Sequence, residues 1–576
     1  MKFNHKIIVG VFAAFALLNS CNVDRLPETS LVDDNFWNNE NDVKLAANYF
    51  YKKLPDLSVS QSIEDVWGDN LARNTSVDKI SDGSRVTPPT SDDYDYSVIY
   101  AANNLLEKAP GVVAKGGKAS DIDNYVGEAY FFRAFSYYKM FIRFGGVPLI
   151  LKTMDINDPE VYKPRATRDE VLNQMYSDLD NAIAKLKTID QLGTTDYGRV
   201  SITAAQALKA RIALFEGTRC KFHGYGDPVK HLKIAKEMSA AVMNSGSHAL
   251  FSTPKAGPNG EIQNDAYYNL FQEAGDGRGN KENILVRIYG NDATNNVTST
   301  TIQRTFEGGN AGPTQSLAAS YVMADGLPTD KSPLYVAPNS TMKYAEYFNK
   351  RDPRMSFSFM KRGDEFTSNG AYTTPNATLA KSGYNVRKYA NAIAWRDQRS
   401  FIDRAIIRYA EVLLTYAEAT YELDGTISDA DLDKTINLLR ARLPQVNIGT
   451  TASPKYVSMA KLTNSFVISN GLSMREEIRR ERRVEFAFEG LRYWDLIRWK
   501  TAETELPKSL TGSYLFTEML DPKTGGWDPK TAVDANNYIL IQDGSFRRFD
   551  PKKDYLWPLP TSEIAKNPKI EQNPGW

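Results

Sequence analysis

The chain has 576 residues, of which 70 are basic and 70 acidic, so its formal net charge is zero. A protein that binds the phosphate backbone of nucleic acid carries an excess of basic residues, so this balance argues against a nucleic-acid partner. The composition is 24% charged and 42% hydrophobic, which is ordinary for a globular protein. The 31 Tyr and 8 Trp suit ligands with flat apolar faces and many hydroxyl groups, and they also suit cores of paired helices.

The N-terminus has the layout of an export signal. A basic start precedes an apolar run from Ile7 to Leu18, which is too short to span a bilayer. The run ends at Leu18-Asn19-Ser20-Cys21, and a Cys directly after a short apolar run and a small residue is typical of a bacterial lipoprotein signal. We therefore expect residues 1–20 to be removed and Cys21 to carry a lipid anchor. An ordinary secretory signal with an incidental Cys is the alternative.

The first half of the chain shows helical periodicity. Asp121 to Phe144 and Thr203 to Phe215 alternate small Ala residues with large aromatic and aliphatic ones, which permits close approach of paired helices. Thr167 followed by Glu170 predicts a capped helix from Arg168 to Lys187. This texture is typical of tetratricopeptide-like helix pairs, although no strict repeat is visible. We predict an N-terminal helical region over residues 21–247.

The texture changes in the middle of the chain. Residues 248–402 are dense in Gly, Asn, Thr, Pro and Asp, with short strand-like runs such as Ile284 to Tyr289. We predict an irregular, loop-rich lobe there. Binding sites tend to lie on loops held by a rigid scaffold, so we expect the ligand to bind to this lobe. Helical patterns return over residues 403–576, at Tyr409 to Leu423, Ala430 to Leu443 and Ser473 to Lys500.

Several separate stretches carry recognisable motifs. They include Phe36-Trp37-Asn38-Asn39-Glu40, Phe144-Gly145-Gly146-Val147-Pro148-Leu149, Arg408-Tyr409-Ala410-Glu411, Glu481-Arg482-Arg483-Val484-Glu485-Phe486, Glu489-Gly490-Leu491-Arg492-Tyr493-Trp494-Asp495 and Asn573-Pro574-Gly575-Trp576. In this order, they resemble the SusD/RagB family of nutrient-binding outer-membrane lipoproteins over almost the whole mature chain. The resemblance implies a mainly α-helical, SusD-like fold, with a scaffold of tetratricopeptide-like helix pairs and an irregular lobe packed against it.

The same resemblance implies a function and a partner. Family members are lipid-anchored at the cell surface in the outer membrane and capture glycan. They act as a lid on a SusC-like TonB-dependent transporter, which imports the captured glycan. They bind without cleaving, so we expect no enzymatic activity. Some members are thought to bind a peptide or protein, which leaves a RagB-like peptide-binding function open.

No short catalytic motif appears in the sequence. A zinc-protease motif, a nucleophile elbow and a Walker phosphate loop are all absent. His223, His231 and His248 are not at metal-ligand spacing, so we expect no cofactor; the family allows a structural calcium, but no calcium-loop pattern is visible. A glycoside hydrolase needs only two carboxylates and leaves no short signature, so it stays an alternative.

Charged residues alternate along the predicted C-terminal helices. Glu481, Arg482, Glu485, Arg492 and Asp495 resemble a catalytic cluster of acids at first sight. Their spacing favours ion pairs three or four residues apart that hold neighbouring helices. We therefore interpret these residues as scaffold.

We expect ligand contacts from residues 63–95 and from the loop-rich lobe, the regions from which relatives draw theirs. The candidates for stacking on sugar faces are Trp67, Tyr268, Tyr289, Tyr372 and Trp395, and those for bonding hydroxyl groups are Asp69, Asn70, Arg73 and Arg396. Each aromatic also has packing as an alternative role, because aromatic residues dominate cores as well as interfaces.

Overall fold

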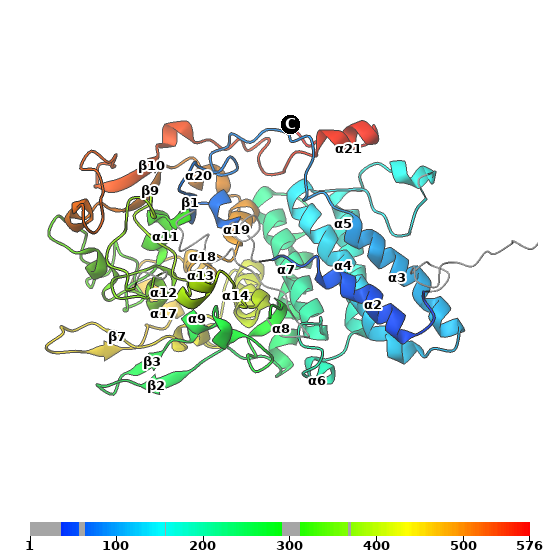
Figure 1. The fold of residues 1–576 in the computed structure, drawn as a ribbon, viewed down its shortest axis with the longest axis horizontal. Helices are drawn as coiled ribbons and strands as arrows, with labels where there is room; N and C mark the ends of the chain where they lie inside the picture. The colour runs from blue at the N-terminus through cyan, green and yellow to red at the C-terminus, as the bar shows by residue number, and fades with distance from the viewer. Residues whose placement is uncertain (1–35, 57–63, 156, 291–310, 367–369) are drawn as a thin grey trace, which may run out of the picture.

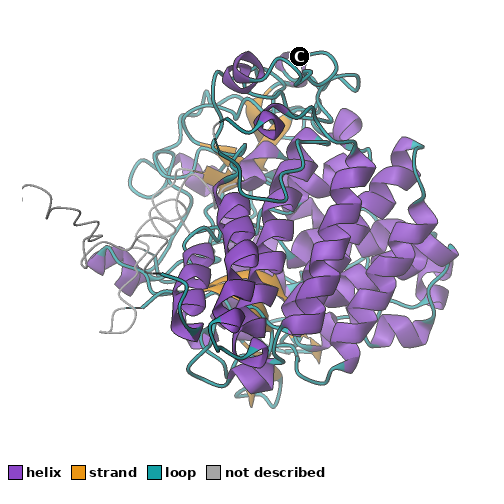
Figure 2. Ribbon diagram, turned by 90° about the vertical axis from the view of Figure 1, so that its right-hand side faces the viewer, coloured by secondary structure: helices purple, strands orange, loops and turns teal. Residues whose placement is uncertain are grey.

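The computed structural model describes residues 36–56, 64–155, 157–290, 311–366 and 370–576. Long helices form one side of the molecule, on the right in Figure 1, and short helices and strands form an irregular lobe on the left. Figure 2 shows the long helices standing side by side. The long helices are α2 (Glu40–Tyr51), α3 (Ser97–Ala114), α4 (Ala119–Phe144), α5 (Arg168–Lys185), α7 (Ile202–His223), α8 (Pro228–Asn244), α14 (Tyr409–Asp424) and α18 (Met474–Glu485).

The shorter elements lie mainly in the lobe and near the C-terminus. The short helices are α6 (Ile189–Leu192), α9 (Ala266–Asn269), α11 (Gln315–Ser320), α12 (Pro353–Ser358), α13 (Ala392–Asp397), α15 (Asp429–Asp433), α16 (Ile436–Ala441), α17 (Asn464–Ser469), α19 (Arg492–Arg498), α20 (Ala502–Glu505) and α21 (Thr561–Lys566). The predicted mainly helical architecture with short strands is confirmed.

The long helices pack in sequence order. Helix α4 lies against α3 and α5, α7 lies against α5 and α8, and α14 continues the row beside α8. The predicted cap of α5 is present: Glu170 N–H donates to Thr167 Oγ1 at 3.2 Å, and Thr167 N–H donates to Glu170 Oε2 at 2.7 Å. These two bonds satisfy N–H groups that the first helical turn leaves without partners.

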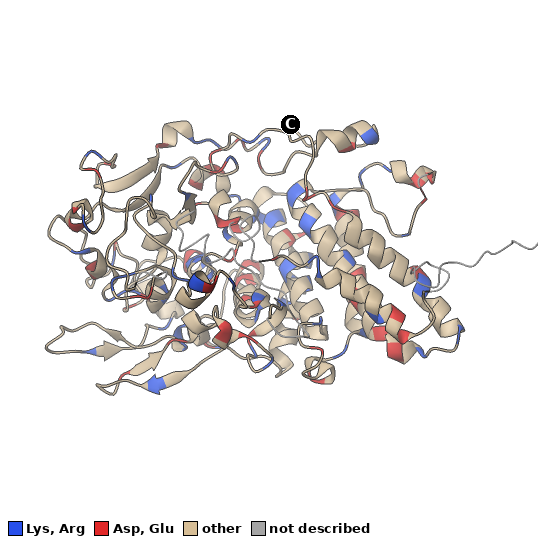
Figure 3. Cartoon of the chain, in the orientation of Figure 1, with Lys and Arg blue, Asp and Glu red and all other residues tan. Residues whose placement is uncertain are grey.

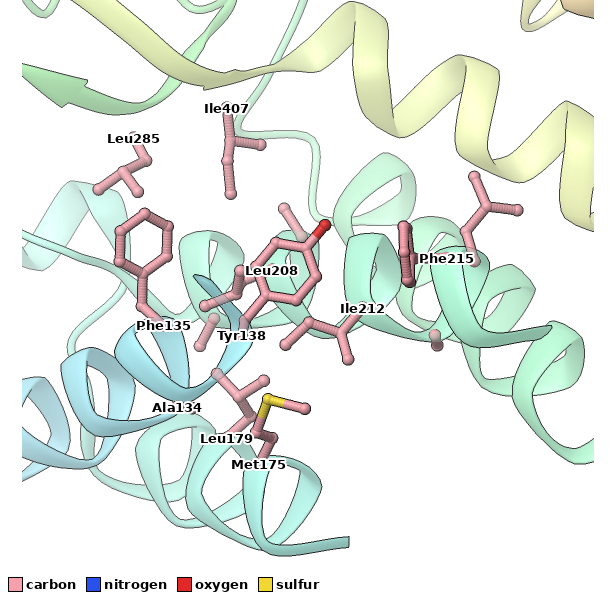
Figure 4. Close-up of a cluster of buried hydrophobic side chains, with 14 of the residues drawn as sticks. Ala134, Phe135, Tyr138, Met175, Leu179, Leu208, Ile212, Phe215, Leu285 and Ile407 are labelled. Atoms are coloured by element: carbon pink, nitrogen blue, oxygen red, sulfur yellow. The ribbon is translucent and has the colours of Figure 1, made fainter. Parts of the chain in front are cut away.

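The core of the scaffold is built from the predicted alternation of small and large residues. Figure 4 shows Phe135 and Tyr138 of α4 facing Leu208 and Ile212 of α7, with Ala134 at the approach to α5. All five side chains are buried. Burying one such large apolar side chain stabilises the fold by about 1.5 to 3 kcal/mol, so these helix contacts hold the scaffold together.

All ten described strands pair in antiparallel twos. The pairs are β1 (Leu71–Arg73) with β5 (Ala311–Pro313), β2 (Pro254–Ala256) with β3 (Ile262–Asn264), β4 (Asn283–Arg287) with β6 (Arg404–Arg408), β7 (Val446–Asn447) with β8 (Tyr456–Val457), and β9 (Leu510–Tyr514) with β10 (Tyr538–Gln542). The β4–β6 pair sets Leu285 opposite Ile407, and both enter the scaffold core (Figure 4). The β1–β5 pair joins the N-terminal segment to the lobe.

The lobe has its own hydrophobic core. Tyr267, Tyr321, Tyr344 and Tyr384 are among its most buried members. This core also takes side chains from outside residues 248–402, for example Phe516. The lobe is therefore assembled from segments that lie far apart in the sequence.

Two predicted helices are interrupted. Ser473 to Lys500 forms α18 and α19, because Phe488 and Gly490 adopt positive φ values of 66° and 80° between them. Gly490 N–H there donates to Asp65 Oδ2 at 2.7 Å, a tertiary contact that local periodicity does not report. Ala430 to Leu443 likewise divides into α15 and α16 at Thr435. The predictions of continuous helices were wrong at these two points.

The charged C-terminal motif is buried between elements. Glu485 bonds Arg354 at 2.9 Å, Arg408 at 2.7 Å and Arg442 at 2.6 Å. These partners hold the pKa of Glu485 well below its usual range despite burial. The scaffold role is confirmed, but most of the pairs join distant parts of the chain. Basic and acidic residues are intermingled over both parts in Figure 3.

Candidate functional site

An open groove lies between α2 and the end of β4. Its volume is about 490 Å³. Residues Lys44, Asn48, Tyr51, Lys52 and Leu54, residues 195–199 and residues 286–288 line it, and we call it the α2–β4 groove. Its walls combine apolar side chains with amide, amine and guanidinium groups, a mixture that suits a ligand with hydroxyl groups on an apolar ring.

Arginines fix the walls of this groove. Arg199 donates to Glu128 through Nε and Nη2, both at 2.8 Å, and through Nη1 to Asn48 Oδ1 at 2.8 Å. Its guanidinium lies 5.2 Å from the ring centre of Tyr51. On the opposite wall Arg287 donates to the carbonyl of Leu54, which ties β4 to the end of α2. Part-buried contacts therefore connect segments of the groove that lie far apart in the sequence, such as Asn48 with Arg199 and Leu54 with Arg287.

The described lining of the α2–β4 groove holds one carboxylate and several hydrogen-bond donors. Among the described residues that line it, Asp196 is the only carboxylate, and Lys44 Nζ lies 3.9 Å from it. Glycoside hydrolysis requires two carboxyl groups about 5 to 9.5 Å apart, one on each side of the scissile bond. These walls can donate hydrogen bonds to hydroxyl groups but do not offer that pair.

A second hollow, of about 470 Å³, lies between the start of α3 and α21. Tyr94, Tyr96, Tyr100 and Tyr162 contribute to its walls, and we call it the tyrosine hollow. Tyr100 is 54% exposed and Tyr162 is 46% exposed, so two aromatic faces reach solvent. The exposed pair was missed, and no local sequence signal marks it.

Trp67 lies in an aromatic cluster of the interior. Its ring centre is 5.1 Å from that of Trp557, 6.0 Å from that of Tyr493 and 6.3 Å from that of Trp494. The Arg143 guanidinium lies 5.8 Å from the Trp67 ring and 5.0 Å from the Trp494 ring. These edge-on and cation–π contacts give Trp67 a packing role in the structure.

Asp69 and Asn70 are buried and bonded within the protein. Asp69 accepts from Arg492 Nε at 2.7 Å and from Arg483 Nη2 at 3.0 Å, and these two guanidinium groups hold the pKa of Asp69 well below its usual range although burial opposes them. Asn70 donates to Asp65 Oδ1 at 2.7 Å and accepts from Arg483 Nε at 2.9 Å. Both side chains join the N-terminal segment to α18 and α19.

The tyrosine candidates of the lobe also have internal partners. Tyr268 donates its hydroxyl to the Ala390 carbonyl at 2.8 Å, and Tyr372 donates to Asn385 Oδ1 at 2.9 Å. Tyr289 is buried, and the Arg287 guanidinium lies 5.7 Å from its ring centre. Tyr289 follows Ile288, which lines the α2–β4 groove, and is therefore the candidate nearest to that groove in sequence.

The remaining candidates lie nearer the surface. Arg73 pairs with Asp78 at 3.5 Å and keeps 30% of its side chain exposed. Trp395 and Arg396 are on α13, where Trp395 is half-buried and Arg396, 64% exposed, pairs with Asp397 at 2.9 Å. None of the nine candidates lines the α2–β4 groove or the tyrosine hollow. Their role as ligand contacts stays a prediction.

Other predicted sites are placed as follows. Cys21 and residues 1–20 lie outside the described residues. Cys220 is buried, and burial together with the nearby Glu216 raises the pKa of its thiol to about 12. Within the described ranges, no three candidate metal ligands come together and no helix is both long and apolar enough to cross a membrane.

Two family models match the chain. One, described as SusD family, covers residues 278–576, and the other, described as starch-binding associating with outer membrane, covers residues 28–214. Together they span both the helical scaffold and the lobe.

Similar proteins match over nearly the full length. SusD-like protein P38 of Formosa agariphila is 24% identical over 99% of this chain and 98% of that protein. SusD-like protein P2 of the same organism is 26% identical over 84% of this chain and 79% of that protein. A SusD-like carbohydrate-binding protein from Bacteroides fragilis has a TM-score of 0.70 at 22% identity and covers 93% of this chain and 100% of that one. A surface glycan-binding protein from Bacteroides fluxus has a TM-score of 0.56 at 18% identity, with 93% and 99% covered.

Proposed function

The chain belongs to the SusD family, and we propose that it captures an oligosaccharide or polysaccharide at the surface of the outer membrane and delivers it to a SusC-like TonB-dependent transporter. The observation that carries the proposal is the match of both parts of the chain to family models, one of them described as starch-binding and associated with the outer membrane. Similar proteins of known structure are named for carbohydrate or glycan binding, which supports a glycan as ligand.

We assign the glycan to the α2–β4 groove. The groove offers about 490 Å³, hydrogen-bond donor groups and the partly exposed apolar surfaces of Tyr51 and Ile288. A sugar ring presents hydroxyl groups around its edge and C–H groups on its faces, so it needs both kinds of wall. The tyrosine hollow has a more apolar lining and is the competing location.

We propose that the protein binds without cleaving, and that a lipid on Cys21 anchors it. The single carboxylate in the groove lining supports the first statement, because hydrolysis needs a pair. A glycan array on the purified chain, followed by chromatography of the bound oligosaccharide after incubation, tests both binding and cleavage. Intact oligosaccharide is the expected result, and a product that depends on the protein would contradict the proposal.

The location is tested with matched variants. Replacing both Asn48 and Lys52 with Ala should weaken binding of the array-selected oligosaccharide by roughly 5- to 100-fold, since each lost hydrogen bond contributes about 0.5 to 1.5 kcal/mol. Lys53→Ala is the control, because this neighbouring side chain pairs with Asp95 at 3.8 Å and does not line the groove. If Tyr100→Ala abolishes binding and the double variant does not, the site lies in the tyrosine hollow and our assignment is wrong.

The transporter partnership has its own test. A chain that delivers glycan to a β-barrel should co-purify with that barrel from detergent-solubilised outer membranes. Recovery of the chain without any TonB-dependent transporter, under conditions that preserve other membrane complexes, would contradict it. Binding of a peptide in place of every glycan on the array would favour the RagB-like function.

A further inference from the structure

A charged cavity beside α18 lies apart from the α2–β4 groove and the tyrosine hollow. Its volume is about 210 Å³. Four arginines contribute to its lining, Arg479, Arg480 and Arg483 from α18 and Arg492 from α19. Three of them, Arg479, Arg483 and Arg492, keep only 10 or 11% of their side chains exposed, so their charged groups are largely removed from solvent.

Arg479 is clamped between two aromatic rings. Its guanidinium carbon lies 4.8 Å from the ring centre of Phe222 and 4.7 Å from that of Trp499. Nη1 makes one long contact, 3.4 Å, with Glu476. Nε and Nη2 have no hydrogen-bond partner among the described residues, and neither does the nearby Thr501 hydroxyl. The Nε–Nη2 edge is one of those through which a guanidinium binds two oxygens of an oxyanion in parallel, so one recognition edge stands unused.

The ion pairs around the cavity leave an excess of positive charge. Arg483 and Arg492 share the single carboxylate of Asp69, at 3.0 and 2.7 Å. The other pairs are one to one: Arg479 with Glu476, Arg480 with Glu477 and Lys508 with Glu505. Among the residues that line the cavity itself, four are arginines and two, Glu476 and Glu505, are carboxylates, so the lining carries more positive than negative charge. Burial and the neighbouring Arg492 lower the pKa of Arg483 to about 10, as expected where like charges are crowded.

We propose that this cavity is a binding site for a small oxyanion group, sulfate or phosphate, held by the free edge of Arg479 with Arg480, Arg483 and Arg492 around it. The volume admits such a group, and its negative charge offsets the excess positive charge of the lining. Bidentate bonds to a guanidinium are among the stronger hydrogen bonds in proteins, and partial burial strengthens them further. The inference does not depend on the proposed glycan function, because it rests on a different cavity.

Titration calorimetry of the purified chain with sodium sulfate tests the proposal, with ionic strength held constant by sodium chloride. Saturable binding is expected for the unmodified protein. Arg479→Lys keeps the charge between the two rings but lacks the paired donors, so it should weaken sulfate binding by about tenfold or more. Arg548→Lys is the control, because this exposed arginine donates to the Gly83 carbonyl and does not line the cavity.

Thermal melts of the same variants show that loss of binding is not loss of folding. The source of the oxyanion is separated by three probes: inorganic phosphate, galactose 6-sulfate against galactose, and vesicles of anionic phospholipid, each in competition with sulfate. Displacement of each probe by sulfate is measured on both proteins. The source is identified by the probe that sulfate displaces from the unmodified protein and for which Arg479→Lys shows no such displacement. Absence of saturable sulfate binding, or unchanged binding by a folded Arg479→Lys protein, would overturn the proposal.

Discussion

Replacing Trp67 with Ala separates packing from ligand binding at one of the candidate residues predicted from the sequence. The indole packs edge-on against three aromatic rings at 5.1 to 6.3 Å, and Arg143 lies over it. Removing a packed Trp costs about 3 to 5 kcal/mol, and because Trp67 is half-buried we expect the lower end, about 3 kcal/mol. Unfolding entropy is about 2.1 cal/mol/K per residue, or about 1.2 kcal/mol/K for 576 residues, so the melting temperature should fall by about 2.5 °C.

The assay pairs a thermal melt with titration calorimetry at a temperature where both proteins are folded. Trp67→Ala should melt earlier and still bind the array-selected oligosaccharide with unchanged affinity. Trp395→Ala is the comparison, because this half-buried side chain sits on the six-residue helix α13 and its loss should lower the melting temperature less. A folded Trp67→Ala protein that melts like the unmodified chain, yet no longer binds, would refute the packing argument.

Three further outcomes follow from the same structure. Cys21→Ala should abolish incorporation of a fatty-acid analogue during metabolic labelling, and retained label would exclude Cys21 as the anchor. Glu485→Gln should lower the free energy of unfolding in urea by about 3 to 5 kcal/mol, since it leaves three buried guanidinium groups without their shared charge; an unchanged urea midpoint would contradict this. Burial and the neighbouring Asp403 raise the pKa of Asp276 to about 8, so its contribution to stability is present below about pH 4 and lost as the pH rises towards 8. Asp276→Asn should therefore flatten the pH dependence of the melting temperature between pH 5 and 8, and an identical profile would count against the shift.

The helical scaffold could be predicted because its causes are local. The alternation of small and large residues in α4 and the cap formed by Thr167 and Glu170 act over a few neighbouring residues, and both appear where expected. The break between α18 and α19 could not be predicted, because the bond that accompanies it comes from Asp65, more than 400 residues earlier. Periodicity reports which face of a helix is apolar and does not report such a contact.

The candidate site was harder to predict from the sequence, because it also depends on contacts between distant segments. Asp69 and Asn70 have side chains suited to bonding hydroxyl groups, but Arg483 and Arg492 reach them from the other end of the chain. The α2–β4 groove in turn joins Asn48 to Arg287, which no local pattern connects. The type of a side chain can be read from sequence, whereas its availability depends on distant partners.

The residues that hold the fold together differ from the exposed residues that line the α2–β4 groove. Arg408, Arg482, Glu485 and Asp495 belong to the motifs by which the chain is recognised, and the structure places all four inside, where Arg408 bonds Glu485 and Arg482 bonds Asp495. Changing them should affect stability before it affects ligand choice, because removing one partner leaves a buried charge unpaired. The lining of the α2–β4 groove includes Arg199, which is paired with the buried Glu128, but also exposed side chains such as Lys52 that can vary without disturbing a buried ion pair. Ligand preference can therefore change on this surface while the recognisable motifs, and with them the fold, stay the same.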